Sequence, residues 1–329
     1  MKILAFAHDP GGANAVAATV ARLQEIGAVV EAYAKGPAIR QFQRLGVAYQ
    51  PVGEEHQPLF VELDGDVLLT GTSQVDEFER DAILWARKKG IPSIAVIDYW
   101  ANYLQRFQPV NHPDAKPIFP DTITAIDETC AAGMIAEGLP SDRIRVVGQP
   151  YFAWLVARQK PQKTKLATPQ YVLFASQYDA NEVEILRILI EVLAEYKPLK
   201  KLLIRFHPRQ NKCPASLSLL AESGLPFAID ESTDVLETIQ QQDIVLGITS
   251  IILIEAALMG IASGSLIIGV EDTLMTNKLG VTYPLTSPEK LQQFLYDQQP
   301  QLVVTDFCVQ QRDADLRIAQ LVMQNGNLY

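Results

Sequence analysis

Short apolar runs alternate along this chain with stretches in which apolar residues recur at helical spacing. The runs in the first half that predict strands are 2–7, 29–34, 47–50, 66–70, 93–97, 122–126 and 144–147. The helical patterns between them are 15–25, 38–44, 75–89 and 128–137. Glycines at Gly27, Gly46, Gly90 and Gly138 fall where helix C-caps are expected. Consecutive strand–helix units of this kind favour a parallel sheet that is covered by helices on both faces.

The same rhythm resumes after a polar, basic stretch that lacks apolar periodicity. The later predicted strands are 171–175, 201–206, 227–229, 243–246 and 262–268. The later predicted helices are 181–195, 216–222, 235–240 and 251–259. We therefore expect an N-terminal domain at 1–157, a linker at 158–169 and a C-terminal domain at 170–329. The predicted fold is α/β, with two Rossmann-like, doubly wound domains that face each other across a ligand cleft.

Composition places the chain among ordinary globular proteins. It has 329 residues, of which 48% are hydrophobic and 20% are charged. A formal net charge of −10 argues against a general nucleic-acid binder, because such proteins neutralise phosphates with Lys and Arg. Three widely spaced cysteines do not suggest a disulfide framework, and reduced thiols fit a cytoplasmic protein best.

No targeting or membrane-spanning segment is expected. The N-terminal MKILAFA is too short for a signal peptide and is typical of a first strand. No apolar run approaches the roughly 18 residues that a membrane span needs. Peripheral membrane association stays open at this point.

The loop HDPGGAN after the first predicted strand carries the first candidate chemistry. His8 and Asp9 are titratable, so either is a candidate general base. Gly11 and Gly12 permit close approach of a ligand and positive φ angles, and Asn14 is an expected helix N-cap. A purely structural tight turn explains the glycines as well as a binding loop does.

Two further loops follow predicted strands and gather polar and aromatic side chains. The acceptor-side or cleft candidates in them are Thr72, Ser73, Asp98, Trp100, Asn102 and Arg106. Aromatic rings in such loops suit the stacking of sugars, although core packing explains them equally well.

A basic loop, RFHPRQNK, follows the strand predicted at 201–206. Six Lys or Arg and no Asp or Glu occur from Lys197 to Lys212, in a chain that is acidic overall. Arg205, His207 and Arg209 therefore suit a diphosphate, since guanidinium groups contact phosphate oxygens in pairs. The alternative is a solvated charged face.

The segment GITSIILIEAALMG predicts a buried strand that leads through Gly247 into an apolar helix. Thr249 and Ser250 fall at the helix start, where backbone N–H groups and the helix dipole favour an anion. Glu255 is the one carboxylate of the helix and would need a hydrogen-bonding partner if buried. The alternative is a capped core helix whose Glu pairs with a neighbouring base.

Motifs for metals and common cofactors are missing. Neither GxGxxG nor a Walker GxxxxGK[ST] occurs, and the four histidines lack metal-ligand spacing. The DxD pattern occurs at 64–66, before a predicted strand, and at 313–315, in a helical segment. The sequence therefore predicts no metal site and no cofactor.

Taken together, these loops resemble the GT-B superfamily of nucleotide-sugar enzymes. HDPGGAN and the helix after it look like the opening of MurG-type and lipid-A-disaccharide-synthase-type transferases. RFHPR looks like the His-Pro loop of CDP-glycerol glycerophosphotransferase-type enzymes, and GITSIILIEAALMG is similar to the donor-binding segment of the superfamily. GQPYF at 148–152 resembles the Gly-x-Pro segment that often precedes the interdomain linker.

The resemblance implies a role for each candidate. Thr249 and Ser250, with Gly247, would bind the donor diphosphate, and Glu255 would hold the ribose hydroxyls. Arg205, His207 and Arg209 would help to neutralise the leaving group. His8 or Asp9 would face the acceptor from the first domain.

The resemblance favours a metal-independent glycosyltransferase, or a related sugar-phosphate transferase, in polysaccharide or glycoconjugate biosynthesis. Its partners would be a nucleotide-sugar donor and an acceptor of unknown identity, with no nucleic acid. The alternatives are a nucleotide-sugar 2-epimerase or hydrolase and a non-catalytic nucleotide-binding protein. UDP-N-acetylglucosamine 2-epimerases usually carry a Gly-Thr-Arg-Pro-Glu-like loop after the first strand, and HDPGGAN replaces it here, which lowers the epimerase alternative.

Overall fold

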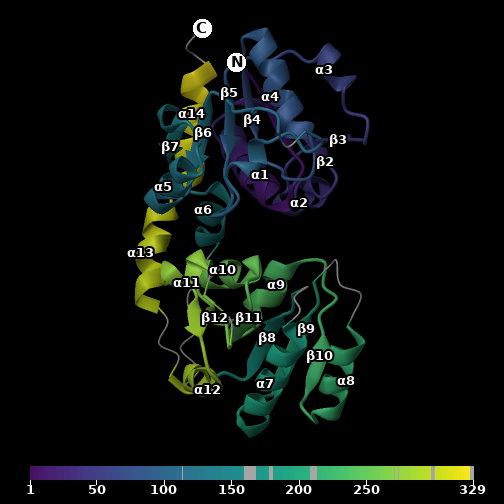
Figure 1. The fold of residues 1–329 in the computed structure, drawn as a ribbon, viewed down its shortest axis with the longest axis vertical. Coiled ribbons are helices and arrows are strands. Elements are labelled where there is room, and N and C mark those ends of the chain that lie inside the picture. The colour runs from purple at the N-terminus through teal and green to yellow at the C-terminus, as the bar shows by residue number, and fades with distance from the viewer. Residues whose placement is uncertain are drawn as a thin grey trace. The chain divides into compact units, whose positions relative to one another are not determined.

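The chain divides into two compact units, which are described separately below (Figure 1). The computed structural model describes residues 1–112, 114–158, 168–177, 181–207, 213–269, 271–272, 274–297 and 301–326. The first unit combines Met1–Trp154 with Gln310–Tyr329, and the second is Leu155–Val309. Most of the linker predicted at 158–169 lies outside the described residues.

The first unit is built on a parallel sheet with the strand order β3-β2-β1-β4-β5-β6-β7. Its strands are β1 (Lys2–Ala7), β2 (Val29–Lys35), β3 (Gln50–Val52), β4 (Val67–Thr70), β5 (Ser93–Val96), β6 (Thr122–Ala125) and β7 (Ile144–Val146). Strands β1, β4 and β5 are mostly apolar and, like β6, almost wholly buried, as a sheet covered on both faces requires.

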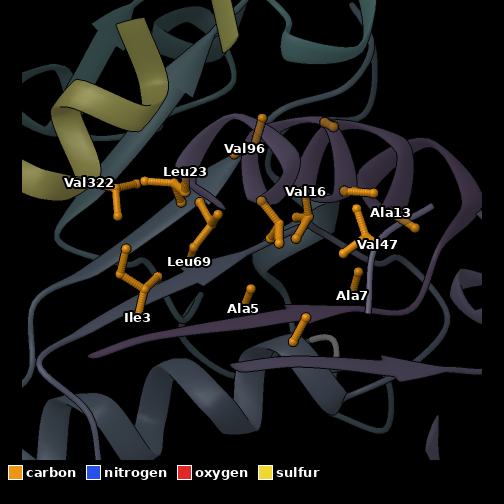
Figure 2. Packing of buried hydrophobic residues seen from close by; sticks show 14 of the residues in the cluster. Ile3, Ala5, Ala7, Ala13, Val16, Leu23, Val47, Leu69, Val96 and Val322 are labelled. Atoms are coloured by element: carbon orange, nitrogen blue, oxygen red, sulfur yellow. The ribbon is translucent and has the colours of Figure 1, made fainter. Parts of the chain in front are cut away.

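Helices cover both faces of this sheet. The helices of this unit are α1 (Pro10–Glu25), α2 (Ala38–Leu45), α3 (Leu59–Glu62), α4 (Phe78–Lys89), α5 (Glu128–Ala136) and α14 (Ala314–Gly326), with short 3-10 turns at η1 (Gln105–Phe107) and η2 (Ser141–Arg143). Helix α6 (Pro150–Val156) runs across the boundary between the units at Leu155. Alternate residues of β1 point to opposite faces, so Ile3 packs with α1 while Phe6 packs with α3 and α4. Figure 2 shows Val16 and Leu23 of α1 lying over the strands, with Val322 of α14 beside them.

The second unit repeats this plan with the order β10-β9-β8-β11-β12-β13, again all parallel. Its strands are β8 (Tyr171–Ala175), β9 (Lys201–Arg205), β10 (Phe227–Ile229), β11 (Ile244–Gly247), β12 (Ala262–Leu266) and β13 (Tyr283–Leu285). Its helices are α7 (Glu182–Glu195), α8 (Pro214–Glu222), α9 (Val235–Gln240), α10 (Ile251–Leu258), α11 (Met275–Lys278) and α12 (Pro288–Asp297). Helix α13 (Gln301–Gln311) leads out of this unit. The core joins apolar residues of β8, β9 and β11 to α7, α8 and α12.

The expected fold class is confirmed, because each unit is a doubly wound parallel sheet of Rossmann-like order. The chain differs from the expected boundaries of 1–157 and 170–329 at its far end. Helix α14 belongs to the first unit, where Ile318, Ala319 and Val322 are fully buried in the same cluster as α1. Strand β13 is not among the predicted strands, since Pro284 at its centre argues against a strand and the segment has only three residues. In the described part of the chain, no helix combines the length and hydropathy of a membrane span.

Candidate functional site

The first unit places three candidate loops at one edge of its sheet. Strands β1 and β4 are neighbours, and the strand order reverses its direction between them. Ligands bind at such a switch point in open α/β sheets, outside the carboxyl ends of the strands. The loops after β1, β4 and β5 carry most of the candidates expected in this half of the chain.

His8, Asp9 and Ser73 form the centre of this edge. Nδ1 of His8 lies 2.7 Å from Oδ1 of Asp9, and the Ser73 hydroxyl donates to the same oxygen at 2.9 Å. Ser73 also accepts from the backbone N–H groups of Val75 and Asp76, which fixes the direction of its own proton. The loops after β1 and β4, 64 residues apart in sequence, are thus joined by the two residues Asp9 and Ser73.

The ionisation of the pair follows from its surroundings. Burial lowers the pKa of His8, but the Asp9 hydrogen bond and the charges of Asp76, Glu79 and Asp9 outweigh it, so that the pKa is raised. Burial raises the pKa of Asp9, but the hydrogen bonds from His8 and Ser73 outweigh it and lower that pKa. The pair therefore favours an imidazolium beside a carboxylate.

A second layer of charged groups lies behind His8, and the sequence patterns did not reveal it. Lys35, at the end of β2, places Nζ 2.7 Å from Oδ2 of Asp76 and 3.3 Å from Nδ1 of His56. Nε2 of His8 lies 3.7 Å from the same oxygen of Asp76. The Lys35 side chain is only 5% exposed. Lysine is rarely buried to this degree unless it is paired with an acidic group, and Asp76 is that group here. The place of Lys35 at the end of a mostly apolar strand is the signal that the sequence offered.

The buried guanidinium of Arg80 holds the loops of this edge together. It donates to the backbone carbonyls of Ser73 and Asp76, after β4, and to that of Arg106 in η1 at 2.8 Å. Its Nε donates to Glu77 at 2.6 Å. The side chain is 2% exposed, so these carbonyl contacts replace water. Arg80 was not predicted as a site residue, because a charged residue on an amphipathic helix normally lies on the solvated face of that helix.

Thr72, Asp98 and Arg106 form a compact cluster beside the His8–Asp9 pair. Arg106 donates to Asp98 and, at 3.0 Å, to the hydroxyl of Thr72. A Cβ built on Gly11 would lie 1.8 Å from Oδ2 of Asp98, and one on Gly12 would lie 3.0 Å from the Thr72 nitrogen. The paired glycines thus let the start of α1 pack directly against these two loops. Both lie inside α1, and neither adopts the positive φ angles that glycine permits.

Three other candidates occupy different environments from those expected. Helix α1 begins at Pro10, since proline is preset for the first helical turn, and Asn14 is an interior residue that accepts from Arg44 at 2.9 Å. The N-cap expected at Asn14 is therefore wrong. Trp100 is 6% exposed, and its indole N–H donates to Asp127 at 2.9 Å, so it belongs to the packed interior. Asn102 is exposed and adopts a left-handed backbone with φ of 57°.

The switch point of the second unit lies between β8 and β11. Thr249 follows β11, and its backbone N–H donates to Oε1 of Gln177, which follows β8. The Thr249 hydroxyl lies 2.8 Å from the same oxygen and 2.6 Å from Nε2 of Gln177. Gln177 is a residue that sequence analysis missed, since nothing in its local pattern marks it. At Gly247, a Cβ would lie 3.0 Å from the carbonyl of Ala175, so that glycine allows the two strand ends to approach closely.

Helix α10 begins as expected at the end of this strand. Ser250 is its N-cap, with Oγ accepting from the N–H of Ile252 at 3.3 Å. Glu255, one and a half turns further on, is 2% exposed. The expected cap at the helix start is present, and the carboxylate lies on the buried side of the helix.

The basic loop after β9 is described only in part. Arg205 donates to the carboxylate of Asp230 and, at 3.2 Å, to the carbonyl of Ser232. These contacts join the ends of β9 and β10. His207 is half-buried, and Arg209 lies outside the described residues.

Two Rossmann-like units of this order define the GT-B fold, and solved structures agree. The UDP-GlcNAc 2-epimerase of Neisseria meningitidis, solved with UDP-GlcNAc bound, is similar with a TM-score of 0.71 at 14% identity. The match covers 98% of this chain and 100% of the epimerase. The UDP-GlcNAc 2-epimerase of Methanocaldococcus jannaschii gives a TM-score of 0.71 at 14% identity, with the same two shares covered.

A transferase shares the same fold. The glycotransferase of kitacinnamycin gives a TM-score of 0.61 at 13% identity, and the match covers 98% of each chain. No protein-family model matches the sequence, and no curated protein does either. Identities this low establish the fold alone.

Proposed function

We propose that this protein is an enzyme that acts on a nucleotide sugar and converts it without a separate acceptor, by epimerisation at C2 or by hydrolysis. The observation that carries the proposal is the end-to-end similarity to UDP-GlcNAc 2-epimerases, which extends over both units. This choice reverses the order expected from the sequence, in which the transferase came first. The similarity of the fold over both units outweighs the loop HDPGGAN after β1, whose sequence differs from that of the epimerases.

The nucleotide end of the substrate is assigned to the second unit. Thr249 and Ser250 stand at the start of a capped helix, where N–H groups and the helix dipole favour a diphosphate. Glu255 is assigned to the ribose hydroxyls, since a carboxylate accepts two hydrogen bonds from a diol. His207 and Arg209 are proposed to neutralise phosphate charge, whereas Arg205 is proposed to support the loop through Asp230.

The first unit is proposed to supply proton transfer. Inversion at a C–H centre removes one proton and returns another to the opposite face, and hydrolysis needs a base for water and an acid for the leaving oxygen. His8, with its raised pKa, is assigned the acid, and the Asp9 carboxylate beside it keeps the imidazole charged and oriented. Asp98 and Thr72, held by Arg106, are proposed to contact the sugar hydroxyls.

A glycosyltransferase is the second candidate. It is favoured by the similarity to the kitacinnamycin glycotransferase and by the loop HDPGGAN, which stands where the epimerases carry a different sequence. In that case the Asp9 carboxylate, or His8 once it has lost its own proton, would take the proton of an acceptor hydroxyl. The substrate class would remain a nucleotide sugar.

Incubation of the purified protein with UDP-, CDP-, GDP- and CMP-sugars, followed by proton NMR, separates the two candidates. An epimer or a free sugar formed without acceptor supports the first proposal. Turnover that begins only when an acceptor glycan is added overturns it in favour of the transferase. Binding without turnover in either case identifies a non-catalytic nucleotide-binding protein.

Calorimetry tests the assignment of the nucleotide site. Glu255→Gln is expected to weaken binding of the preferred nucleotide by 10-fold or more, at about 1.4 kcal/mol per factor of ten. Glu237→Gln, on exposed helix surface in the same unit, is the matched control and should bind as the parent does. Equal affinities for the two variants would remove Glu255 from the site.

A further inference from the structure

Glu79 is a buried carboxylate that the roles assigned above do not use. It is the second residue of α4 and is 2% exposed. Its Oε1 accepts a hydrogen bond of 2.8 Å from the backbone N–H of His8. Within the part of the chain that the structure describes, Oε2 has no hydrogen-bond partner. One oxygen of Glu79 therefore supports the candidate acid, while the other is enclosed and unsatisfied.

Such an arrangement is costly for the fold. A buried carboxylate loses its hydration, and a single hydrogen bond from an N–H group does not replace it. Burial accordingly raises the pKa of Glu79 to about 7, although the His8 N–H opposes the change. A glutamine would accept the same hydrogen bond without carrying a charge. Support of the His8 backbone alone therefore does not require a carboxylate.

The charge of Glu79 acts on a histidine that is already enclosed by ionisable groups. From the loop after β1, Asp9 lies 2.7 Å from Nδ1 of His8, and from the loop after β4, Asp76 lies 3.7 Å from Nε2. From β2, Lys35 is engaged with Asp76 at 2.7 Å. Arg80, beside Glu79 on α4, directs its guanidinium to backbone carbonyls and to Glu77. The carboxylates that act on His8 are thus those of Asp9, Asp76 and Glu79, with the cations of Lys35 and Arg80 beside them.

The remaining neighbours of His8 fix the position of its ring or lie too far away, or too exposed, to affect its charge strongly. A Cβ on Gly36, which follows β2, would lie 3.0 Å from Nε2 of His8, so the glycine leaves the ring its space. His56 lies behind Lys35 and binds Asp81 of α4 at 2.8 Å. Glu54 reaches Lys35 at 3.9 Å from an exposed position, where solvent screens its charge. The His8 ring is held by Asp9 on one nitrogen and faces Asp76 with the other.

We propose that Glu79 is a positioning residue for the His8–Asp9 pair: one oxygen fixes the His8 backbone, and the carboxylate charge keeps the imidazole protonated. The inference rests on the proposed function only in that His8 is the acid of that reaction. In the neutral range Glu79 loses its proton, and its new charge then opposes proton loss from His8. The acid therefore stays charged to higher pH than a histidine without this neighbour.

NMR titration of the His8 ring tests the proposal without any substrate. The Hε1 signal of His8 is assigned with His8→Gln and followed with pH in the parent, in Glu79→Gln and in Glu62→Gln, an exposed matched control. Glu79→Gln is expected to lower the His8 midpoint by about 0.5–1 pH unit, the low end of the effect of one neighbouring charge. The control should leave the midpoint in place. An unshifted midpoint in Glu79→Gln overturns the proposal, since glutamine preserves a purely structural role.

A second measurement covers a Glu79→Gln variant that does not fold. The ¹³C chemical shift of the Glu79 carboxyl carbon is followed with pH in labelled parent protein. The proposal requires Glu79 to ionise in the pH range where the titration curve of the His8 ring shows a second inflection. A Glu79 carboxyl that stays protonated from pH 6 to 8 overturns the proposal, because it then carries no charge that could act on His8. If nucleotide sugars are not turned over but the His8 midpoint shifts, the proposed function fails while this inference stands. If turnover occurs, Glu79→Gln should move the alkaline limb of its pH profile in the same downward direction as the His8 midpoint.

Discussion

The Oδ2 atom of Asp98 lies so close to Gly11 that a Cβ on this glycine would be 1.8 Å away. Asp98 is held in that position by Arg106, which also binds Thr72. The start of α1 thus packs against a carboxylate with no space for a side chain. Negative charge at a helix N-terminus is favourable, so the contact is electrostatically sound as well as tight.

Gly11→Ala is expected to lower the free energy of unfolding by about 1–3 kcal/mol, the usual cost of overpacking. The added methyl group must displace Asp98 and strain its contact with Arg106. Urea denaturation measures the effect. Gly53→Ala is the control, because nothing lies within 4 Å of a Cβ there. Equal stabilities of the two variants would contradict the close approach.

The Lys35–Asp76 pair can be separated by a double-mutant cycle. Lys35→Met leaves a partly buried carboxylate without its cation and should cost about 3 kcal/mol at pH 7. Lys35 helps to hold the pKa of Asp76 low against the effect of burial, so the deficit should shrink as pH falls and Asp76 becomes protonated. Lys35→Met/Asp76→Asn should recover more than half of the loss. Additive single effects would show that the two side chains are not coupled.

The free energy of unfolding should fall as pH rises from the ordinary pKa of Glu79 towards its raised pKa in the folded protein. Its pKa of about 7 in the folded protein exceeds the ordinary 4.5, so the folded state binds more protons than the unfolded state between these values. The cost is complete above pH 7 and amounts to about 3 kcal/mol. Glu79→Gln should therefore gain stability over the parent at pH 8 relative to pH 5, by thermal or urea unfolding. If the difference in unfolding free energy between Glu79→Gln and the parent does not vary with pH, Glu79 has its ordinary pKa in the folded protein.

Two helix caps in the second unit offer a matched comparison. Ser250 caps α10 and Asp234 caps α9, each accepting from the backbone N–H two residues on. Ser250→Ala and Asp234→Ala should each cost about 1 kcal/mol of stability. Only Ser250→Ala should also weaken nucleotide binding, by roughly 10-fold, if the start of α10 holds the phosphates. If Ser250→Ala and Asp234→Ala change the calorimetric affinity for the nucleotide equally, Ser250 only caps α10 and does not bind the phosphates.

The strands were largely predictable because buried parallel strands are short apolar runs with clear ends. Lys2–Ala7, Tyr171–Ala175 and Phe227–Ile229 have the predicted bounds. The start of α1 was predicted five residues too late, because Asn14 was taken as its cap although Pro10 is favoured at the first helical position. The packing of α14 on α1 was not predictable, since apolar periodicity does not name the surface that it covers.

The candidate site divides in the same way. Residues in loops directly after strands, such as Asp9, Ser73 and Thr249, could be proposed because parallel strands end at one edge. Glu79 and Arg80 could not, because they are charged residues of an amphipathic helix, and their burial depends on tertiary contacts. Trp100 was proposed for the site as an aromatic loop residue, and its burial and its bond to Asp127 show that it packs inward.

The place of α14 has a consequence for synthesis on the ribosome. The first unit draws its sheet from the beginning of the chain, but the cluster on α1 includes Ile318, Ala319 and Val322. Until these residues leave the exit tunnel, the apolar face that they cover stays open to water and to other chains. The second unit is continuous in sequence and needs no residue beyond Val309 for its core. The part of the protein that is made first therefore cannot complete its core until α14 has been made.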